Sequence, residues 1–172
     1  MSGEPKVILV NFQDQQTGVM GKMKAHQEAR LHRAFSVFLY HGDQILLQKR
    51  AKNKYHCGSL WTNTCCSHPA RGEPVLLAAE RRLDEELGIK NARLRELDTF
   101  LYRAAFPNGL AEHELDHVLL GEYSGPVQPD PMEIAQVRWI DLEELQRDLQ
   151  AFPQWYTPWF PPALTLVLRH LS

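Results

Sequence analysis

The chain has 172 residues, which is the length of one compact domain and leaves little room for a second core. Its 19 Lys and Arg residues and 21 Asp and Glu residues give a formal net charge of -2, so it lacks the basic excess that general nucleic-acid binding requires. Apolar residues make up 44% of the chain, yet no continuous apolar tract of about 20 residues occurs. The composition predicts one globular domain with neither a nucleic-acid nor a membrane partner.

The first five residues, Met1 to Pro5, contain no basic region followed by an apolar stretch, so no secretory signal or transit peptide is predicted. Three cysteines are present, and two of them, Cys65 and Cys66, are adjacent. An odd number with this spacing does not make the disulfide framework of a small secreted domain. We therefore expect a cytoplasmic protein with reduced thiols.

Runs of apolar and β-branched residues predict six strands, and two turn sequences join four of them into hairpins. The strands span residues 7–12, 34–40, 44–48, 99–103, 111–120 and 137–140. The turns are His41-Gly42-Asp43 and Pro107-Asn108-Gly109.

The most regular helical pattern covers residues 74–87. Pro74 in the first turn and Gly88 just past the end fit a helix of this length. The apolar positions that recur every three or four residues are Leu76, Ala79, Leu83 and Leu87.

Two further helices are predicted near the C-terminus. Asp141 and Glu144 form a capping-box pattern that starts a helix at Leu142, and a last helix begins near Pro162. Strands on both sides of a central helix predict an α+β fold with a mixed sheet sandwiched between helices.

The segment from Trp61 to Pro69 is the richest in reactive side chains. Pro69 disfavours a helical conformation at His68, so this stretch is predicted to be extended, with Cys66 and His68 on one face about 6.5 Å apart. The thiol beside the imidazole fits a nucleophile or acid, or an imidazole that holds a metal. The alternatives are a buried Cys66 with a loop histidine, and a structural zinc site, which is disfavoured because adjacent cysteines rarely chelate one ion. Its ligands would be Cys57, Cys65, Cys66 and His68.

Glu112 and Glu114 lie two positions apart in a predicted strand, which places both carboxylates on one face. Two such carboxylates repel each other unless a cation or a shared proton lies between them. A solvated strand face, continued by Asp116, is the competing interpretation.

Three histidines are candidates for the same cation. His26 and His32 lie six residues apart, and either alone is more often a surface residue than a ligand. With His68, Glu112 and Glu114 they would provide a five-ligand nitrogen and oxygen site for a divalent transition metal or magnesium.

Two groups of cations fit a small polyanion such as a diphosphate, although solubility explains them equally well. They are Lys22, Lys24, Lys49, Arg50, Lys52 and Lys54. Arg82 and Glu86 have the spacing of an ordinary helix-surface salt bridge. The aromatic residues Tyr102, Trp155, Tyr156, Trp159 and Phe160 are core or rim packing by default, but an indole face also stabilises a cation.

Together these residues resemble the type I isopentenyl-diphosphate isomerase family, whose members share the Nudix fold. The resemblance is carried by the stretch from Thr62 to Pro69 and by Glu112-His113-Glu114. Residues 67–89 are similar to a Nudix box, with matches at Glu73, Arg81, Glu85, Glu86 and Gly88. Ser67 replaces the leading Gly, and Arg82 replaces a Glu, which argues against the usual hydrolase.

The resemblance implies one Nudix-like isomerase domain over residues 1–172, with the box helix inside 67–89. It assigns one divalent ion (Mn²⁺, Zn²⁺ or Mg²⁺) to His26, His32, His68, Glu112 and Glu114. It assigns a Mg²⁺ that arrives with the diphosphate to Glu86. We expect a monomer or weak dimer whose partner is a small-molecule diphosphate.

The resemblance also implies the catalytic residues. Cys66 takes the thiol position, and Glu114, paired with Tyr102, takes the acid/base position on the opposite side of the substrate. The expected substrate-binding residues are Lys22, Arg50, Lys54, Arg82, Trp61 and Trp159. Tyr55-His56-Cys57-Gly58 departs from the aromatic-Pro-Gly turn of many members.

The implied reaction is the conversion of isopentenyl diphosphate to dimethylallyl diphosphate, with a proton delivered to C4 and another removed from C2. We favour Glu114 with Tyr102 as the donor and Cys66 as the acceptor. The alternatives are a Nudix pyrophosphohydrolase of nucleoside diphosphate derivatives and a non-catalytic, metal-stabilised binding module.

Overall fold

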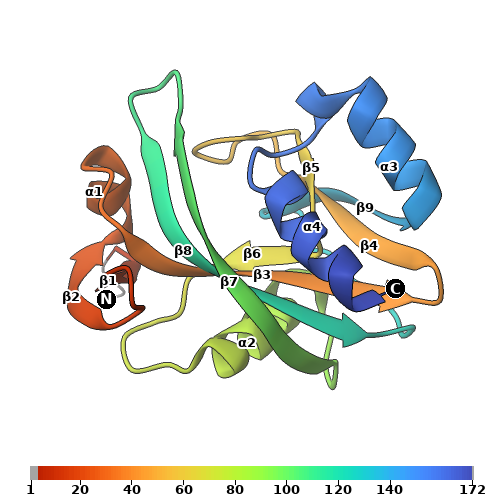
Figure 1. Ribbon diagram of the computed structural model, residues 1–172, viewed down its shortest axis with the longest axis horizontal. Helices are drawn as coiled ribbons and strands as arrows, with labels where there is room; N and C mark the ends of the chain where they lie inside the picture. The colour runs from red at the N-terminus through yellow and green to blue at the C-terminus, as the bar shows by residue number, and fades with distance from the viewer. Residues whose placement is uncertain (1–3, 172) are drawn as a thin grey trace.

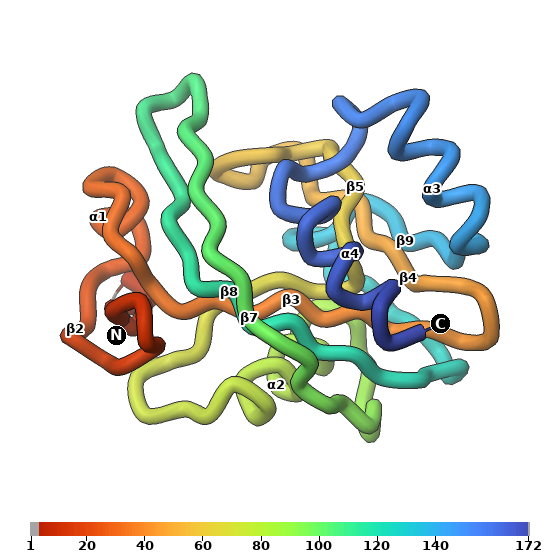
Figure 2. Tube along the Cα trace, viewed as in Figure 1, coloured from red at the N-terminus to blue at the C-terminus, as the bar shows by residue number. Residues whose placement is uncertain are grey.

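The computed structural model describes residues 4–171. Residues 1–3 and 172, which the expected domain bounds include, lie outside the described part, as does the start of the Met1 to Pro5 segment. Figure 1 shows a central sheet with helices on both faces, and Figure 2 traces the chain from one end of the molecule to the other. Within residues 4–171, none of the helices has the length and apolar character needed to span a membrane.

The described chain contains nine strands and four α-helices. In order they are β1 (Lys6–Val10), β2 (Gln16–Gly21), α1 (Lys22–Gln27), β3 (His32–His41), β4 (Gln44–Arg50), β5 (Trp61–Thr62), β6 (Cys65–Ser67), α2 (Val75–Leu87), β7 (Arg93–Ala105), β8 (Ala111–Glu122), β9 (Ile134–Asp141), α3 (Leu142–Ala151), the 3-10 helix Pro153–Trp155 and α4 (Phe160–Leu171).

The sheet is mixed, as the sequence predicts. β3 runs parallel to β8 and antiparallel to β1, β4 and β6. β7 and β8 form a long antiparallel hairpin, and β4 also pairs with β5 and β9. β3 therefore lies beside four strands, of which β6 and β8 are distant from it in the chain.

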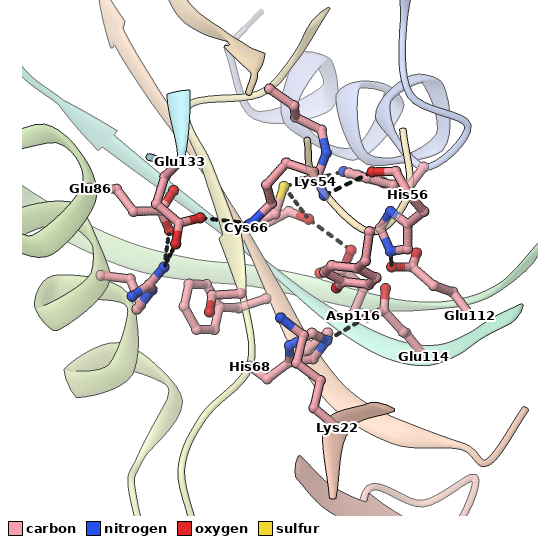
Figure 3. Close-up of a pocket in the computed structure, with 18 of the residues that line it drawn as sticks. Lys22, Lys54, His56, Cys66, His68, Glu86, Glu112, Glu114, Asp116 and Glu133 are labelled. Atoms are coloured by element: carbon pink, nitrogen blue, oxygen red, sulfur yellow. Dashed lines mark hydrogen bonds and ion pairs between the residues drawn. The ribbon is translucent and has the colours of Figure 1, made fainter. Parts of the chain in front are cut away.

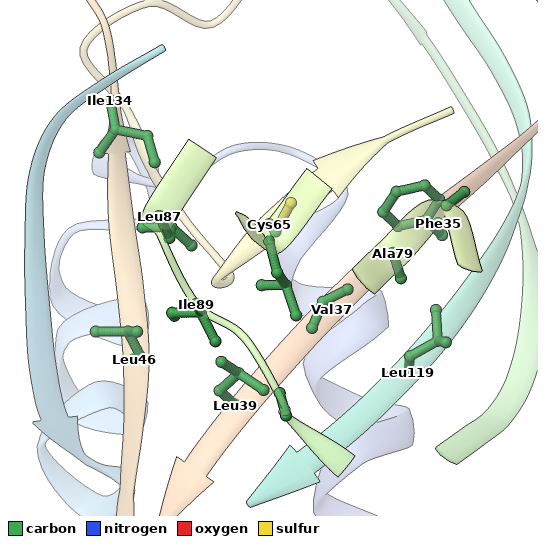
Figure 4. Packing of buried hydrophobic residues seen from close by; sticks show 13 residues of the cluster. Phe35, Val37, Leu39, Leu46, Cys65, Ala79, Leu87, Ile89, Leu119 and Ile134 are labelled. Carbon is green, nitrogen blue, oxygen red and sulfur yellow. The ribbon is translucent and has the colours of Figure 1, made fainter. Parts of the chain in front are cut away.

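The two faces of the sheet carry separate apolar cores, because successive side chains of a strand point to opposite sides. Phe35, Val37 and Leu39 of β3 pack with α2 in one cluster (Figure 4). Phe38 of the same strand packs with α4 in the second cluster. Its ring stacks on that of Phe160, with 5.8 Å between the ring centroids. This arrangement confirms the mixed sheet sandwiched between helices.

Helix α2 occupies the predicted span, with two differences in detail. Pro74 is the N-cap and not a first-turn residue, and Leu76 is exposed, so Ala78 joins Ala79, Leu83 and Leu87 on the buried face. The helix ends at Gly88, whose φ of 62° is the left-handed conformation that glycine adopts without strain.

Helix α3 begins at Leu142 as predicted, but the capping box does not form. Asp141 makes no side-chain cap hydrogen bond. Glu144 instead accepts a hydrogen bond from Arg138 at 2.5 Å. A neighbouring cation on β9 therefore competes successfully for the glutamate.

Candidate active site and metal centre

A cavity at one end of the sheet gathers most of the predicted site residues (Figure 3). Its walls come from α1, β3, β4 and the loop after it, β6 and the residue that follows it, α2, β8, and the turns before β9 and α4. The lining residues are Lys22, Ala34, Phe35, Ser36, Gln48, Arg50, Lys54, Tyr55, His56, Cys66, Ser67, His68, Arg82, Glu86, Glu112, Glu114, Asp116, Glu133 and Trp159.

Three imidazoles surround Glu114, a buried residue of β8. His68 Nε2 lies 2.9 Å and His32 Nε2 3.3 Å from Glu114 Oε2. The ring of His26 is 5.2 Å from that of His32 and 5.9 Å from that of His68. The structure thus brings together His26, His32, His68 and Glu114 as one group of ion-ligating side chains.

The backbone fixes which ring nitrogens face this group. His26 Nδ1 lies 2.7 Å from the carbonyl oxygen of Lys22, one turn back on α1, and His32 Nδ1 lies 2.8 Å from that of Arg30. The Nε2 atoms of both rings are buried and find no hydrogen-bond partner among residues 4–171. Buried imidazoles with orphaned nitrogens aimed at carboxylates fit a divalent ion.

Glu112 is also buried, so the solvated strand face weighed against a metal site is wrong. His26 Nε2 lies 3.7 Å from Glu112 Oε1, and His56 Nε2 contacts the same oxygen. The structure therefore adds one residue, His56, that the sequence analysis did not assign. The available signal in the sequence was the position of His56 in Tyr55-His56-Cys57-Gly58, which departs from the aromatic-Pro-Gly turn of many family members.

The protonation states of His68 and Glu114 suit ligation. Burial lowers the pKa of His68 to about 4, so this imidazole is neutral. Burial opposes ionisation of Glu114, but the adjacent imidazoles of His32 and His68 hold its pKa well below the usual value. Neutral imidazole and ionised carboxylate are the forms that bind a cation.

Cys66 lies on β6, on the cavity side, where it shares a face with His68. Its Sγ donates to Asn63 Oδ1 at 3.0 Å and accepts a hydrogen bond from Trp159 Nε1 at 3.2 Å. Burial, with the charge of Asp116, raises the pKa of the thiol to about 12. The resting group is therefore a protonated thiol.

Cys65 points the other way, into the apolar core beneath α2. It is fully buried, and its Sγ lies 3.5 Å from Glu86 Oε2. Neither ion-ligating group found within the described residues contains a cysteine. The zinc alternative built on Cys57, Cys65, Cys66 and His68 therefore has no support.

Tyr102 stands directly opposite Glu114 in the β7–β8 pairing. Burial, together with the charges of Glu112 and Glu114, raises its pKa, so the phenol keeps its proton. Its hydroxyl finds no hydrogen-bond partner within the described chain, and its ring lies 6.1 Å from that of Trp159 in an edge-to-face arrangement.

The cavity is basic away from the imidazoles. Lys22, Arg50, Lys54 and Arg82 all line it, as predicted. Lys54 and Arg82 are held by acidic partners, with Lys54 Nζ 2.7 Å from Glu133 and Arg82 Nη2 2.9 Å from Glu86. The Arg82–Glu86 pair is therefore part of the cavity wall and not the exposed salt bridge of the alternative interpretation.

Trp61 is the one expected substrate-binding residue that does not line this cavity. It is not among the lining residues and packs instead against the core that contains Phe38 and Phe160. Its carbonyl oxygen accepts a hydrogen bond from Thr157 at 2.9 Å.

The NUDIX domain model matches residues 30–161. The chain is 46% identical over 158 residues to the isopentenyl-diphosphate Delta-isomerase of Burkholderia multivorans, covering 91% of this chain and 89% of that protein. It is 44% identical over 166 residues to isopentenyl-diphosphate Delta-isomerase 2 of Aromatoleum aromaticum, covering 96% and 87%.

Solved structures agree on the fold. A crystal structure from Deinococcus radiodurans superposes with a TM-score of 0.70 at 21% identity, over 85% of this chain and 89% of that one. A MutT NUDIX hydrolase from Burkholderia pseudomallei gives 0.65 at 26%, over 80% and 98%. The curated relatives match far more strongly in sequence, and the chain belongs to the isopentenyl-diphosphate Delta-isomerase family, within the Nudix fold.

Proposed function

We propose that this protein is an enzyme that converts isopentenyl diphosphate to dimethylallyl diphosphate in isoprenoid biosynthesis. The observation that carries the proposal is the placement of Cys66 and Glu114 in the wall of one cavity, with Trp159 hydrogen-bonded to the sulfur. The imidazole cluster lies beside Glu114, and the basic residues supply a place for the diphosphate. The relatives that carry this name match over most of the chain.

The reaction moves a double bond without net change in composition. The C3=C4 electron pair takes a proton at C4, which leaves a tertiary cation at C3. The C2–H electron pair then forms the C2=C3 bond, and its proton passes to the base. One acid and one base on different sides of the substrate suffice.

The acid strengths decide between the two groups. An alkene is a weak base, so it requires the stronger acid, and protonated Glu114 is stronger because His32 and His68 stabilise its carboxylate. Burial makes the Cys66 thiolate the stronger base. We therefore assign protonation to Glu114 with Tyr102 and deprotonation to Cys66. Before turnover the resting proton of Cys66 must pass to the carboxylate of Glu114, which leaves the acid protonated and the base as a thiolate.

The aromatic wall protects the cation. The faces of Trp159 and Tyr102 are attractive to positive charge, and a closed pocket keeps out water that would trap it. Arg50 lies over the Trp159 ring at 5.4 Å, which positions the indole from the diphosphate side.

The donor set fits two cations. The nitrogen-rich cluster favours Mn²⁺ or Zn²⁺, with Mg²⁺ as the third candidate, and Glu86 suits the Mg²⁺ that arrives with the diphosphate. When bound, the first ion would fix and polarise Glu114, and the second would neutralise the diphosphate.

We further propose that residues 1–172 act as one Nudix-like isomerase domain, a monomer or weak dimer in the cytoplasm. Its partner is the diphosphate alone. The free cysteines at positions 57, 65 and 66 support a reducing compartment.

Hydrolysis of nucleoside diphosphate derivatives is the competing activity within the Nudix fold. It needs several carboxylates on the box helix to gather Mg²⁺. Here Arg82 replaces one of them, and Glu85 is exposed and paired with Arg81 and Arg82. The helix thus offers Glu86 to the cavity and cations around it, which favours holding a diphosphate over cleaving it.

The test is turnover of isopentenyl diphosphate with magnesium by the purified protein, followed by NMR. Formation of dimethylallyl diphosphate is expected, and Cys66→Ala and Glu114→Gln should abolish it while circular dichroism stays unchanged. Release of monophosphate from a compound such as ADP-ribose, with no alkene shift, would establish the hydrolase instead.

A further inference from the structure

His56 lies in the loop between β4 and β5 and reaches into the cavity beside the histidine and glutamate side chains of the candidate metal site (Figure 3). Its ring is 5.8 Å from that of His26, which matches the 5.9 Å between His26 and His68. The ring of His56 is therefore as close to the ring of His26 as is that of His68, which is an expected metal ligand.

The His56 side chain is buried, with an exposed fraction of 6%, and it is held by aromatic contacts. It stacks on Phe106 at 4.7 Å and lies edge-on to Trp159 at 5.8 Å. These contacts fix the plane of the ring but satisfy neither nitrogen. Asn108, at the tip of the β7–β8 hairpin, secures the loop by donating to the carbonyl oxygen of Tyr55 at 2.8 Å.

Within residues 4–171, neither ring nitrogen of His56 has a partner in hydrogen-bond geometry. Nε2 contacts Glu112 Oε1, a carboxylate oxygen that also faces His26. A buried polar nitrogen without a partner costs free energy, typically about 1–3 kcal/mol, so such a nitrogen aimed at a carboxylate points to a shared ligand.

The ligating side chains form two groups, and both contain His26. One comprises His26, His32, His68 and Glu114, and the other comprises His26, His56 and Glu112. His26 Nδ1 faces the carbonyl oxygen of Lys22, so Nε2 is the nitrogen that it offers to both groups. The two groups thus meet at His26 Nε2, the point at which an ion would adjoin the ligands of each.

We propose that His56 is a sixth ligand of this ion, beside His26, His32, His68, Glu112 and Glu114. The inference rests on the metal centre included in the proposed function and adds to it a ligand that the family resemblance does not supply. Four imidazole nitrogens and two carboxylate oxygens make a six-coordinate set, which disfavours Mg²⁺ and favours a transition ion.

A full set of protein ligands has a consequence for the reaction. A catalytic metal keeps an open position for water or substrate, whereas a closed site does not. With His56 bound, no position remains for the diphosphate or the alkene. The site then serves to hold Glu114 in place, and the diphosphate depends on the basic residues and Glu86.

The experiment measures the ion directly in the full chain. The protein is loaded with Zn²⁺, its metal content is measured, and the imidazole ligands are counted by X-ray absorption. Affinity is measured by competition with a chelator. His56→Gln is the informative variant, because its amide can donate a hydrogen bond to Glu112 but provides no imidazole. His113→Gln, on the same strand as Glu112 and Glu114, is the matched control.

We expect one Zn²⁺ with four imidazoles in the wild type and three imidazoles in His56→Gln. Removing the ligand should weaken Zn²⁺ binding by at least about tenfold, since even outer partners contribute about 10–100-fold. His113→Gln should match the wild type. Circular dichroism of the metal-free variants shows whether each is folded.

Three imidazoles in the wild type, or unchanged affinity in His56→Gln, would overturn the proposal. Two ions that fall to one in His56→Gln would also overturn it, because His56 would then belong to a separate site. A wild type that isomerises its substrate with a three-imidazole site would leave the proposed function intact. A wild type that binds no ion would refute both this proposal and the metal centre.

Discussion

Trp159 Nε1 donates a hydrogen bond to Cys66 Sγ at 3.2 Å, which links the turn before α4 to β6 across the cavity. This bond stabilises the thiolate and lowers the pKa of Cys66, against the larger effect of burial. A donor to a charged acceptor contributes about 1.5–3 kcal/mol. The indole therefore makes the thiol more usable as a base.

Trp159→Phe keeps an aromatic ring but removes this donor. We expect the pKa of Cys66 to rise further and kcat to fall by roughly tenfold to a hundredfold, which corresponds to the energy of the lost bond. The measurement is the rate of Cys66 alkylation at pH 9 alongside kcat, with Cys66→Ala as the background. An unchanged alkylation rate would show that the bond has no effect on the thiolate.

The adjacent cysteines offer a matched pair. Cys65→Ala removes a buried sulfur from the core, so we expect about 1 kcal/mol of lost stability with most isomerase activity retained. Cys66→Ala should be stable and inactive. Thermal unfolding and turnover of the two variants distinguish them, and loss of activity in Cys65→Ala alone would mean that the thiols have been assigned the wrong way round.

Lys22 predicts a pH dependence. Burial and the nearby charge of Lys54 lower its pKa to about 8, so the ammonium is charged below pH 8 and neutral above it. The kcat/KM for the diphosphate should therefore fall as pH rises through about 8, with a smaller change in kcat. Lys22→Arg stays charged and should remove this inflection. An inflection that persists in Lys22→Arg belongs to another group.

Glu86 predicts the magnesium requirement. It is buried and faces the cavity, whereas the neighbouring Glu85 is exposed. Glu86→Gln should raise the Mg²⁺ concentration needed for half-maximal activity by at least about tenfold, without loss of the ion in the imidazole cluster. Glu85→Gln is the control. An equal effect in both variants would show that Glu86 is not a specific ligand of the Mg²⁺ that arrives with the diphosphate.

Much of the fold follows from local patterns in the sequence. The helix at 75–87, the β7–β8 hairpin and the start of α3 all appear where periodicity and turn residues place them. β2 and α1 were not predicted, because Gln16–Gly21 is polar and glycine-containing, and α1 has only six residues. β2 forms by pairing with β1, and α1 is a short helix in the segment that connects β2 to β3. Local sequence alone therefore indicates neither element.

The site was predictable where a motif fixes side chains on one strand. Cys66 with His68, and Glu112 with Glu114, share faces because of the two-residue period of an extended chain. The neighbours of His56 were not predictable, since Phe106 and Trp159 reach it from distant parts of the sequence. Trp61 was misplaced for a related reason. It adjoins the motif from Thr62 to Pro69, but the motif does not indicate that Trp61 packs against the core around Phe38 and Phe160.

The most direct test of the central claim follows deuterium from heavy water into isopentenyl diphosphate in Cys66→Ala, by proton NMR. If Glu114 with Tyr102 protonates C4 and Cys66 accepts the proton from C2, this variant should exchange the C4 hydrogens and form no dimethylallyl diphosphate. Glu114→Gln should exchange none. Exchange at C4 in Glu114→Gln, with none in Cys66→Ala, would contradict the assignment.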